Sequence, residues 1–417
     1  VNGEKVNICA IHPGDKISIG GVDMELVPIT KRQEQLQSQL RTRGSGPISS
    51  IFGLILLTLL QAAMLMGFLL SGVEEEYPSY VLGFCSVAIC QWGLFLFYTV
   101  IHRSSFEVET LAFFLCTLGM AAIATVKPGE ILKQAAAMVL GVLTFLLIGW
   151  SLRDLERAKR FRYLAVLLGV GFLVITLLFG REYYGAKNWL VIGGLSLQPS
   201  ELSKVCFVYA GASTMDRIMN KRNLILFIAY SVVICGLLAL MNDFGTAMIF
   251  FCAFLIIAYL RSGSVGTIAL ACTALGFAGV LAIRIAPHAL NRFATWRHIW
   301  ENPYSSGYQQ TQAIMCIASG GLFGLGAGKG FLQKVFAADS DIVFATISEE
   351  WGLLLALLAV LAVAALGFFA IRTARVSRSS FYCIGGCTAA GILLIQAALN
   401  CLGTVDVLPF TGVTFPF

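Results

Sequence analysis

The chain contains ten apolar runs that are each long enough to cross a bilayer, and this feature limits its fold more than any other. A helix needs about 20 mainly apolar residues to span the hydrocarbon core. Backbone groups in lipid must also bond to one another, which favours helices. The runs lie near 48–70, 80–101, 110–126, 133–152, 163–179, 223–241, 245–260, 267–285, 351–371 and 382–402. They predict an all-α polytopic membrane protein.

Composition supports this assignment and excludes a soluble protein. Of the 417 residues, 58% are hydrophobic and 12% are charged, which is too apolar a balance for a soluble domain to hide in its core. The formal net charge is +6, but the basic residues form short clusters between apolar runs instead of one stripe. We interpret these clusters as topology signals and expect no nucleic-acid partner.

A further helix at 200–214 is weak by hydropathy, because the segment is short and carries Glu201 and Lys204. Counting it as a span places the basic loops on one side along the whole chain, as the positive-inside rule requires. We therefore expect about eleven transmembrane helices, with the N-terminus in the cytoplasm and the C-terminus outside. The basic side receives Lys31, Arg32, Arg41, Arg43, Arg103, Arg153, Arg157, Lys159, Arg160, Arg162, Arg217, Lys221, Arg222, Arg261, Arg372, Arg375 and Arg378. The outward side receives residues 74–76, 180–199, 242–243 and 287–345.

The N-terminal residues have a different pattern. Residues 1–30 alternate short apolar stretches with turn signals, which predicts β structure. Residues 31–46 are polar and rich in Gln, Arg and Ser, so we expect a linker or a juxtamembrane helix.

Charged residues in or beside membrane helices are candidates for function, and the first group lies between 183 and 204. Lys187 and Trp189 fall in an outward loop, and Glu201 and Lys204 share one helix face at the start of a span. A functional pair and a structural ion pair, with Ser200 as a first-turn polar residue, account for this pattern equally well.

A second candidate is the glycine-rich stretch of the long outward loop. Its glycines at 320, 321, 324, 326, 328 and 330 permit close backbone approach and leave amides for anionic oxygens. Tight packing of a re-entrant segment explains the same glycines as well.

The third candidate is an acidic stretch that contains Asp339, Asp341, Glu349 and Glu350. Desolvation beside apolar residues raises the pKa of an aspartate, which suits a general base acting on a sugar hydroxyl. Acidic capping at the start of the next membrane helix explains Glu349 and Glu350. It explains Asp341 less well, because that residue is set back within a loop.

Metal ligands give no comparable signal. The four histidines are scattered, and His288 and His298 stand ten residues apart, which is not a helical ligand spacing. We predict no zinc site, and the sequence leaves open whether a divalent cation takes part in function.

Six ordered segments resemble the SEDS family (shape, elongation, division and sporulation), the RodA, FtsW and SpoVE type of wall polymerase. Each segment is weak alone, but six in this order make a strong signal. They are GAKNW (185–189), QPSELSK (198–204), DFGTA (243–247), GYQ with SGG (307–309 and 319–321), SDIVFATISEEWG (340–352) and LPFTGVTFPF (408–417).

The resemblance implies an inverting peptidoglycan glycosyltransferase that joins the disaccharide of lipid II to a growing strand on the outer face of the cytoplasmic membrane. Undecaprenyl diphosphate leaves, and no covalent intermediate is needed. Asp341 matches the family's essential aspartate. A class B penicillin-binding transpeptidase is the implied partner. The residues expected to bind substrate are Lys187, Trp189, Gln198, Ser200, Glu201, Lys204, Tyr308, Gln309, Gln312 and Ser319.

The sequence also departs from the family pattern. Asn188 replaces a basic residue, Phe336 and Ala337 replace a proline and a glutamate, and Trp351 stands where leucine is common. We expect two extra helices in 47–108, a polymerase domain at 109–417, and the last family helix beyond Phe417.

The N-terminal stretches VNGEKV and GDKISIGG resemble the last strands of a forkhead-associated domain, so residues 1–30 are interpreted as part of one. A complete domain of this type would bind a phosphothreonine protein, and here it would do so in the cytoplasm.

Two other functions stay open. A flippase for the lipid-linked precursor would also use a polar cavity with buried charges, although we find no internal repeat of the kind that transporters often carry. A catalytically inactive scaffold with a forkhead-associated part is the third interpretation.

Overall fold

A computed structural model of the chain describes residues 47–71, 74–103, 105–183, 186–192, 195–215, 221–266, 287–377 and 379–417, with shorter pieces at 12, 14–19, 22–25, 27, 30–33, 269, 272–273 and 276. In this part of the chain, nine helices are long and apolar enough to cross a membrane. They are α2 (Pro47–Ser71), α3 (Tyr77–Val100), α4 (Glu107–Val126), α5 (Ile131–Leu152), α6 (Leu155–Phe179), α8 (Lys221–Leu240), α9 (Phe244–Ser262), α14 (Leu353–Val376) and α15 (Ser380–Thr404). The prediction of a polytopic helical membrane protein is therefore confirmed.

The weak helix at 200–214 also forms, as α7 (Pro199–Met215). It has 17 residues and packs against α6, α9 and α15, so neighbouring helices bury Ser203 and Lys204, while Glu201 stays exposed. The predicted span at 267–285 lies outside the residues that the structure describes, apart from single positions. The expected total of about eleven helices therefore stays a prediction.

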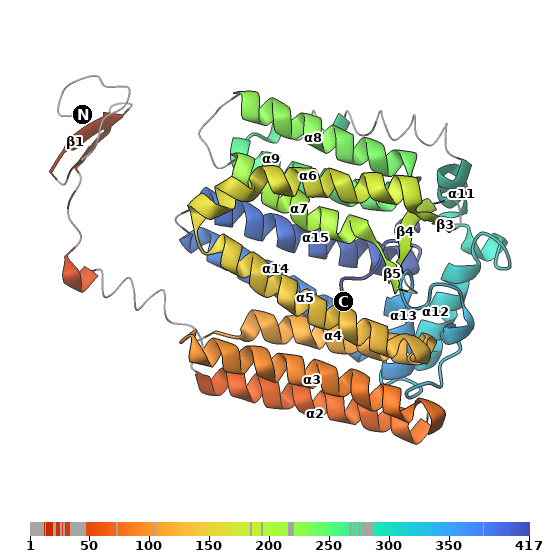
Figure 1. Cartoon of the computed structure of the whole chain (residues 1–417). Coiled ribbons are helices and arrows are strands. Elements are labelled where there is room, and N and C mark those ends of the chain that lie inside the picture. The colour runs from red at the N-terminus through yellow and green to blue at the C-terminus, as the bar shows by residue number, and fades with distance from the viewer. Residues whose placement is uncertain are drawn as a thin grey trace.

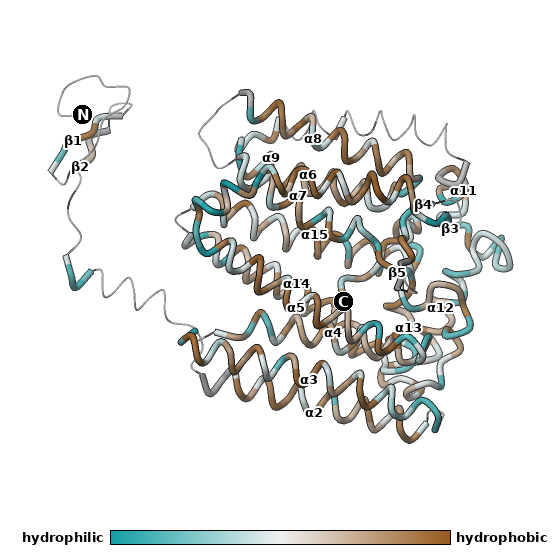
Figure 2. Tube along the Cα trace, viewed as in Figure 1, coloured by the Kyte–Doolittle hydropathy of each residue, from teal (hydrophilic) through white to brown (hydrophobic). Residues whose placement is uncertain are grey.

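The long helices lie side by side, and their connections gather at two ends (Figure 1). The candidate segments 181–197 and 287–351 lie together at one end, while the turns after α5 and α14 lie at the other. Hydropathy follows the same division, with apolar residues along the helices and polar ones concentrated at their ends (Figure 2). Which of the two ends faces the cytoplasm stays a prediction from the loop charges.

Two small antiparallel sheets accompany the helices. One joins β3 (Arg181–Tyr183), β4 (Ala186–Ile192) and β5 (Leu195–Leu197) in a segment expected to be only a loop. The other pairs β1 (Lys16–Ile19) with β2 (Val22–Glu25) in the N-terminal segment, where β structure was predicted.

Among the described residues 287–351, between α9 and α14, lie three short helices, namely α11 (Pro287–Thr295), α12 (Tyr308–Gly320) and α13 (Val343–Trp351). Gly352 separates α13 from α14 with a φ of 90°. A side chain there would collide with the chain, since an added Cβ would lie 2.2 Å from the carbonyl oxygen of Leu322. The two helices therefore meet at a sharp corner that only glycine fits.

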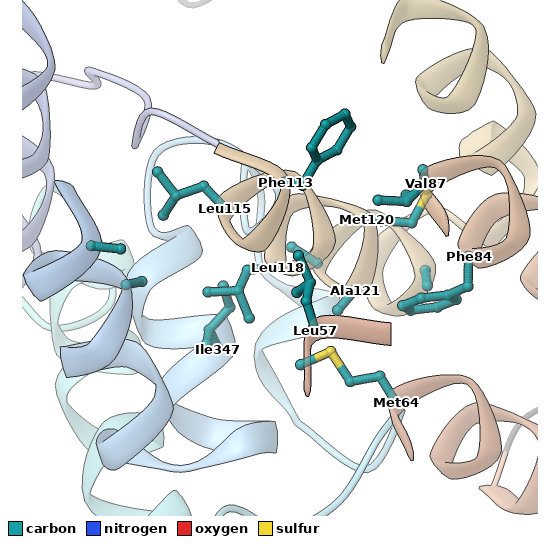
Figure 3. Packing of buried hydrophobic residues seen from close by; sticks show 14 of the residues in the cluster. Leu57, Met64, Phe84, Val87, Phe113, Leu115, Leu118, Met120, Ala121 and Ile347 are labelled. Carbon is teal, nitrogen blue, oxygen red and sulfur yellow. The ribbon is translucent and has the colours of Figure 1, made fainter. Parts of the chain in front are cut away.

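The buried apolar residues form two large clusters, one at each side of the bundle. The first is built mainly by α2, α3, α4, α13 and α14, and Figure 3 shows Leu57 and Met64 facing the same interior as Leu118 and Ile347. The second is built by α6, α7, α8, α9 and α15. The first cluster brings α2 and α4 together with the short helix that follows Asp341.

A buried polar cluster also joins α2, α3 and α4. The amide of Gln61 donates to Gln91 and to Thr117, at 3.0 Å each, and Gln91 donates to Thr58 at 2.8 Å. Gln91 is fully buried. Since lipid offers no alternative partners, such bonds fix which helix faces meet.

Replacing Gln91 with alanine should lower the free energy of unfolding by about 1–2 kcal/mol, because it leaves Gln61 and Thr58 with fewer partners. Thermal unfolding of the purified protein in detergent measures this change. The control is Ile89→Ala on the same helix, whose side chain is 71% exposed and faces the lipid in this arrangement. Equal melting of the two variants would contradict the assigned role of the cluster.

Candidate functional site

The backbone around Asp341 is held from several sides. Its amide donates to the carbonyl of Ala337 at 3.0 Å, and Ala337 has a φ of 56° in the left-handed region, which a non-glycine residue adopts only at a cost. Asn400 on α15 donates to the carbonyl oxygens of Asp341 and Val413, both at 2.8 Å. One buried amide thus joins the Asp341 loop to the C-terminal segment.

The Asp341 carboxyl faces Arg292 and Gly412. A Cβ placed on Gly412, whose φ is 66°, would lie 3.2 Å from Asp341 Oδ2 and 3.6 Å from both terminal nitrogens of Arg292. Arg292 also donates from Nη1 to the carbonyl of Thr411 at 2.7 Å. The carboxyl and the guanidinium therefore both border the space that glycine leaves open at position 412.

Burial raises the pKa of the Asp341 carboxyl to about 6, against a usual value near 4. The Ser340 hydroxyl and the Arg292 charge act in the opposite direction, while Asp339 and Asp243 raise the pKa further. Asp339 itself forms an ion pair with Lys127, at 2.7 Å, which ties the end of α4 to this loop. A carboxyl with this pKa exchanges a proton readily near neutral pH.

The predicted pair on α7 is present. Lys204 Nζ lies 2.6 Å from Glu201 Oε2, and the lysine side chain is 6% exposed whereas the glutamate is 45% exposed. Ser200, in the first turn, is buried and Gln198, just before the helix, is half-buried. The helix therefore holds a buried cation next to a partly solvent-exposed carboxylate.

Lys187 and Trp189 are half-buried on β4, opposite Glu182 and Arg181 of β3. The backbone amide of Lys187 donates to the carbonyl of Met241 at 3.0 Å, so β4 lies against the end of α8.

Asp243, two residues later, links this region to Asp341. Its side chain accepts from the amide of Thr246 at 3.1 Å and so caps α9. A Cβ on Gly245 would lie 2.9 Å from the Thr411 carbonyl, which places the start of α9 against the segment that faces Asp341. The residues before α9 thus contact the sheet at Met241, and the start of α9 contacts the C-terminal segment that faces Asp341.

The predicted residues of α12 divide into two groups. Tyr308 is exposed, Gln312 is half-buried, and Gln309 donates to the carbonyl of Phe336 at 2.8 Å, in the Asp341 loop. Ser319 is exposed and bonds to Cys316 of its own helix at 2.8 Å. It lies at the other end of α12, where its neighbour Gly320 contacts the backbone of Glu349. The structure therefore brings Gln309, but not Ser319, to the loop of Asp341.

The structure corrects the interpretation of Glu349 and Glu350. They lie in the last turn of α13, not at the start of the next membrane helix, and both are 1% exposed. Glu349 accepts from the amides of Phe331 and Leu332, at 2.8 and 3.0 Å. Their role is to bind the glycine-rich loop and not to cap a helix.

The same contacts decide between the two interpretations of the glycine-rich loop. Glu350 accepts from the amides of Gly328 and Gly330 at 3.1 Å each, and its backbone carbonyl accepts from Gly326 at 3.0 Å. These amides are occupied by the protein's own groups, so the structure favours packing of a re-entrant segment over anion binding at these positions.

Sequence reasoning missed Arg292 and Asn400 as site residues, and it did not pair Lys127 with Asp339. Asn400 is a polar residue within an apolar run, which is itself a signal. Lys127 and Asp339 are 212 positions apart, so only folding reveals the pair. Within the described ranges, no three His, Cys, Asp or Glu side chains come together as they would to hold a metal ion.

Two solved structures share this fold. A chain from a structure described as "Structural coordination of polymerization and crosslinking by a peptidoglycan synthase complex" matches with a TM-score of 0.62 and 22% identity, over 75% of this chain and 90% of that one. The rod shape determining protein RodA of Thermus thermophilus matches with a TM-score of 0.52 and 23% identity, over 74% of this chain and 88% of that one. At these identities the likeness shows the fold alone.

Sequence comparison finds curated relatives. The peptidoglycan glycosyltransferase RodA of Mycobacterium tuberculosis is 30% identical over 308 residues, which cover 68% of this chain and 65% of the relative. The probable peptidoglycan glycosyltransferase FtsW of Bacillus subtilis is 29% identical over 364 residues, which cover 81% and 84%. The chain thus spans slightly less than two thirds of the mycobacterial relative's length.

A family model described as "Cell cycle protein", for FtsW, RodA and SpoVE, matches residues 82–417. The match begins within α3 and includes Asp341, Arg292 and the sheet β3–β5. The chain therefore belongs to the FtsW/RodA/SpoVE family, the SEDS family that the six sequence segments resemble.

Proposed function

We propose that this protein is a peptidoglycan glycosyltransferase that polymerises lipid II on the outer face of the cytoplasmic membrane. The observation that carries the proposal is the half-buried Asp341 carboxyl, whose pKa is raised to about 6 and which faces Arg292 in a member of this family. Relatives named as peptidoglycan glycosyltransferases support the same activity.

Asp341 acts as the general base in this mechanism. It takes the proton from the acceptor sugar hydroxyl as that oxygen attacks the anomeric carbon of the donor. The bond between that carbon and the diphosphate oxygen breaks, and the diphosphate leaves with the electron pair. Attack opposite the leaving group inverts the anomeric centre without a covalent intermediate. The proton then passes from Asp341 to water.

Cations on the same end of the bundle stabilise the charge on the leaving diphosphate. Lys204 and Lys187 are the proposed contacts, because Lys204 is buried beside Glu201 and Lys187 lies on the sheet that contacts the end of α8. Trp189, Gln198, Ser200, Tyr308, Gln309 and Gln312 are proposed to line the path of the sugar. Ser319, at the far end of α12, is proposed to contact a more distant part of the substrate.

The end of the bundle that holds the Asp341 loop is proposed to face outward, which places the basic loops in the cytoplasm. A transpeptidase is the proposed partner. It would be a class B penicillin-binding protein, and a related chain belongs to a structure described as a peptidoglycan synthase complex for polymerization and crosslinking.

The forkhead-associated interpretation of the N-terminus stays a separate hypothesis. The β1–β2 hairpin is compatible with it, but the family match begins at residue 82 and does not include it. Binding of a phosphothreonine peptide to the full-length protein tests it, and unchanged fluorescence anisotropy of a labelled peptide would reject it.

Replacing Asp341 with asparagine should lower lipid II polymerisation at least about 100-fold, because the amide cannot take a proton. Glycan strands are measured on gels with purified protein and labelled lipid II. Asp154→Asn is the control, since Asp154 caps α6 at the other end of the bundle and asparagine caps equally well. Full activity of the Asp341 variant would reject the mechanism, and lipid movement across vesicles without polymer would favour a flippase.

Substitution of two neighbours of Asp341 should shift the pH dependence of the rate in opposite directions. A base with a pKa of about 6 works when deprotonated, so the rate should rise with pH and level off above that value. Arg292 lowers this pKa and Asp339 raises it. Arg292→Gln should therefore move the midpoint to higher pH and Asp339→Asn to lower pH. Shifts in the same direction would show that Asp341 does not set the profile.

Replacing Lys204 with glutamine should lower kcat/KM by about 100-fold, because a buried cation near the leaving group is lost. Lys133→Gln is the matched control, since Lys133 also pairs with a glutamate three residues away but is 44% exposed. Steady-state polymerisation rates compare the two variants, and equal rates would remove Lys204 from the proposed site.

A further inference from the structure

Helix α2 lies entirely outside the family match, yet it contacts the glycine-rich loop directly. The match covers residues 82–417, and α2 spans Pro47–Ser71. Its last turn reaches the end of the bundle where that loop lies (Figure 1). The helix therefore supports the matched region from outside it.

The contact is close and specific. The Ser71 hydroxyl lies 2.5 Å from the carbonyl oxygen of Ala327, as a donor to it. A Cβ on Gly67 would lie 3.3 Å from the Trp351 ring and 3.4 Å from Ala327 Cβ. Glycine at 67 thus lets the helix backbone approach both the loop and the corner before α14.

An aromatic contact extends this surface. The ring of Phe68 lies 5.8 Å from that of Trp351 and 5.2 Å from that of Tyr80 on α3. Phe68 is 1% exposed. Trp351 directly follows Glu350, whose carboxylate binds the loop amides of Gly328 and Gly330. The helix therefore touches both the loop and the residue beside its carboxylate anchor.

The loop leads into the Asp341 segment through a series of fixed points. After Ala327 come the amides bound by Glu350 and Glu349, then Asp339 paired with Lys127, and then Asp341 bound by Asn400. Glu350 is also held from α4, since Thr125 donates to it at 2.6 Å. Few residues between Ala327 and Asp341 are free to move, so a displacement at Ala327 is transmitted to Asp341.

We propose that α2 is a positioning element for the Asp341 loop, acting through Gly67, Phe68 and Ser71 on Ala327 and Trp351. The effect on catalysis rests on the proposed function, whereas the effect on the loop does not. The buried Gln61–Gln91–Thr117 bonds hold α2 on α3 and α4, so the helix is a fixed support for the loop.

The test compares two glycine-to-leucine variants of the full-length protein in detergent. Gly67→Leu places a side chain where the first carbon already lies 3.3 Å from Trp351, so it must push the loop away. Gly93→Leu on α3 is the control, because a Cβ there meets nothing within 4 Å. Leucine has a higher helix propensity than glycine, so neither substitution weakens the helix in which it lies.

Hydrogen–deuterium exchange of the peptide covering 322–334 is the first measurement. Most of its amides donate to protein groups in the present structure, so Gly67→Leu should speed their exchange at least about fivefold relative to Gly93→Leu. Exchange in the second helical cluster, such as α8 and α9, should be unchanged. Ser71→Ala, which removes only the hydroxyl, should also speed the exchange of this peptide, but by a smaller factor. Unchanged loop exchange in Gly67→Leu, or equal changes throughout the bundle, would overturn the proposal.

Polymerisation by the same proteins is the second measurement. Gly67→Leu should lower kcat at least about fivefold and leave the KM for lipid II within about twofold, because the loop holds the base and not the cations of β4 and α7. A raised KM with an unchanged kcat would overturn this part. If the unmutated protein makes no polymer while the loop exchange still responds, the proposed function fails and the positioning of the loop stands.

Discussion

Two buried carboxylates, Glu349 and Glu350, are the constraint on which the end of the bundle that holds the Asp341 loop depends. Each is 1% exposed in an apolar bundle, where a carboxylate without partners is costly. The bonds they need come from the backbone amides of Gly328, Gly330, Phe331 and Leu332 and from the hydroxyl of Thr125. The same hydrogen bonds therefore satisfy the carboxylates and fix the conformation of the glycine-rich loop. The corner at Gly352 makes these bonds possible, because it ends α13 and turns the chain into α14.

The position of Asp341 follows from this arrangement. The carboxylates fix the chain up to Leu332, and Lys127 and Asn400 fix residues 339–341. Asp341 is then left between apolar surroundings, which raise its pKa, and Arg292, which lowers it. A group balanced in this way is more useful for proton transfer than either a fully exposed aspartate or a tightly paired one. In the proposed mechanism, the loop contributes to proton transfer by setting this balance.

The parts of the fold that local patterns determine were predictable. Long helices follow from apolar runs, and even the weak α7 followed from the charges of the loops around it. The raised pKa of Asp341 was expected from its apolar neighbourhood, while its role as a base stays a prediction. The sheet β3–β5 was missed because its strands have only 3 to 7 residues and lie in a segment dominated by turn signals. Glu349 and Glu350 were misplaced because the helix break at Gly352 depends on a contact with Leu322 that the sequence does not reveal.

Long-range contacts account for the remaining gaps, and they also explain one departure in the sequence. Trp351 looks anomalous when residues 340–352 are considered alone. In the structure its ring lies against Phe68 and above Gly67, two residues of a helix that the family match does not include. A large aromatic side chain at 351 and a glycine at 67 fit each other, because the missing side chain of one makes room for the ring of the other. Trp351, which departs from the family pattern, and the additional helix α2 thus belong to one packing arrangement, and the presence of each explains the other.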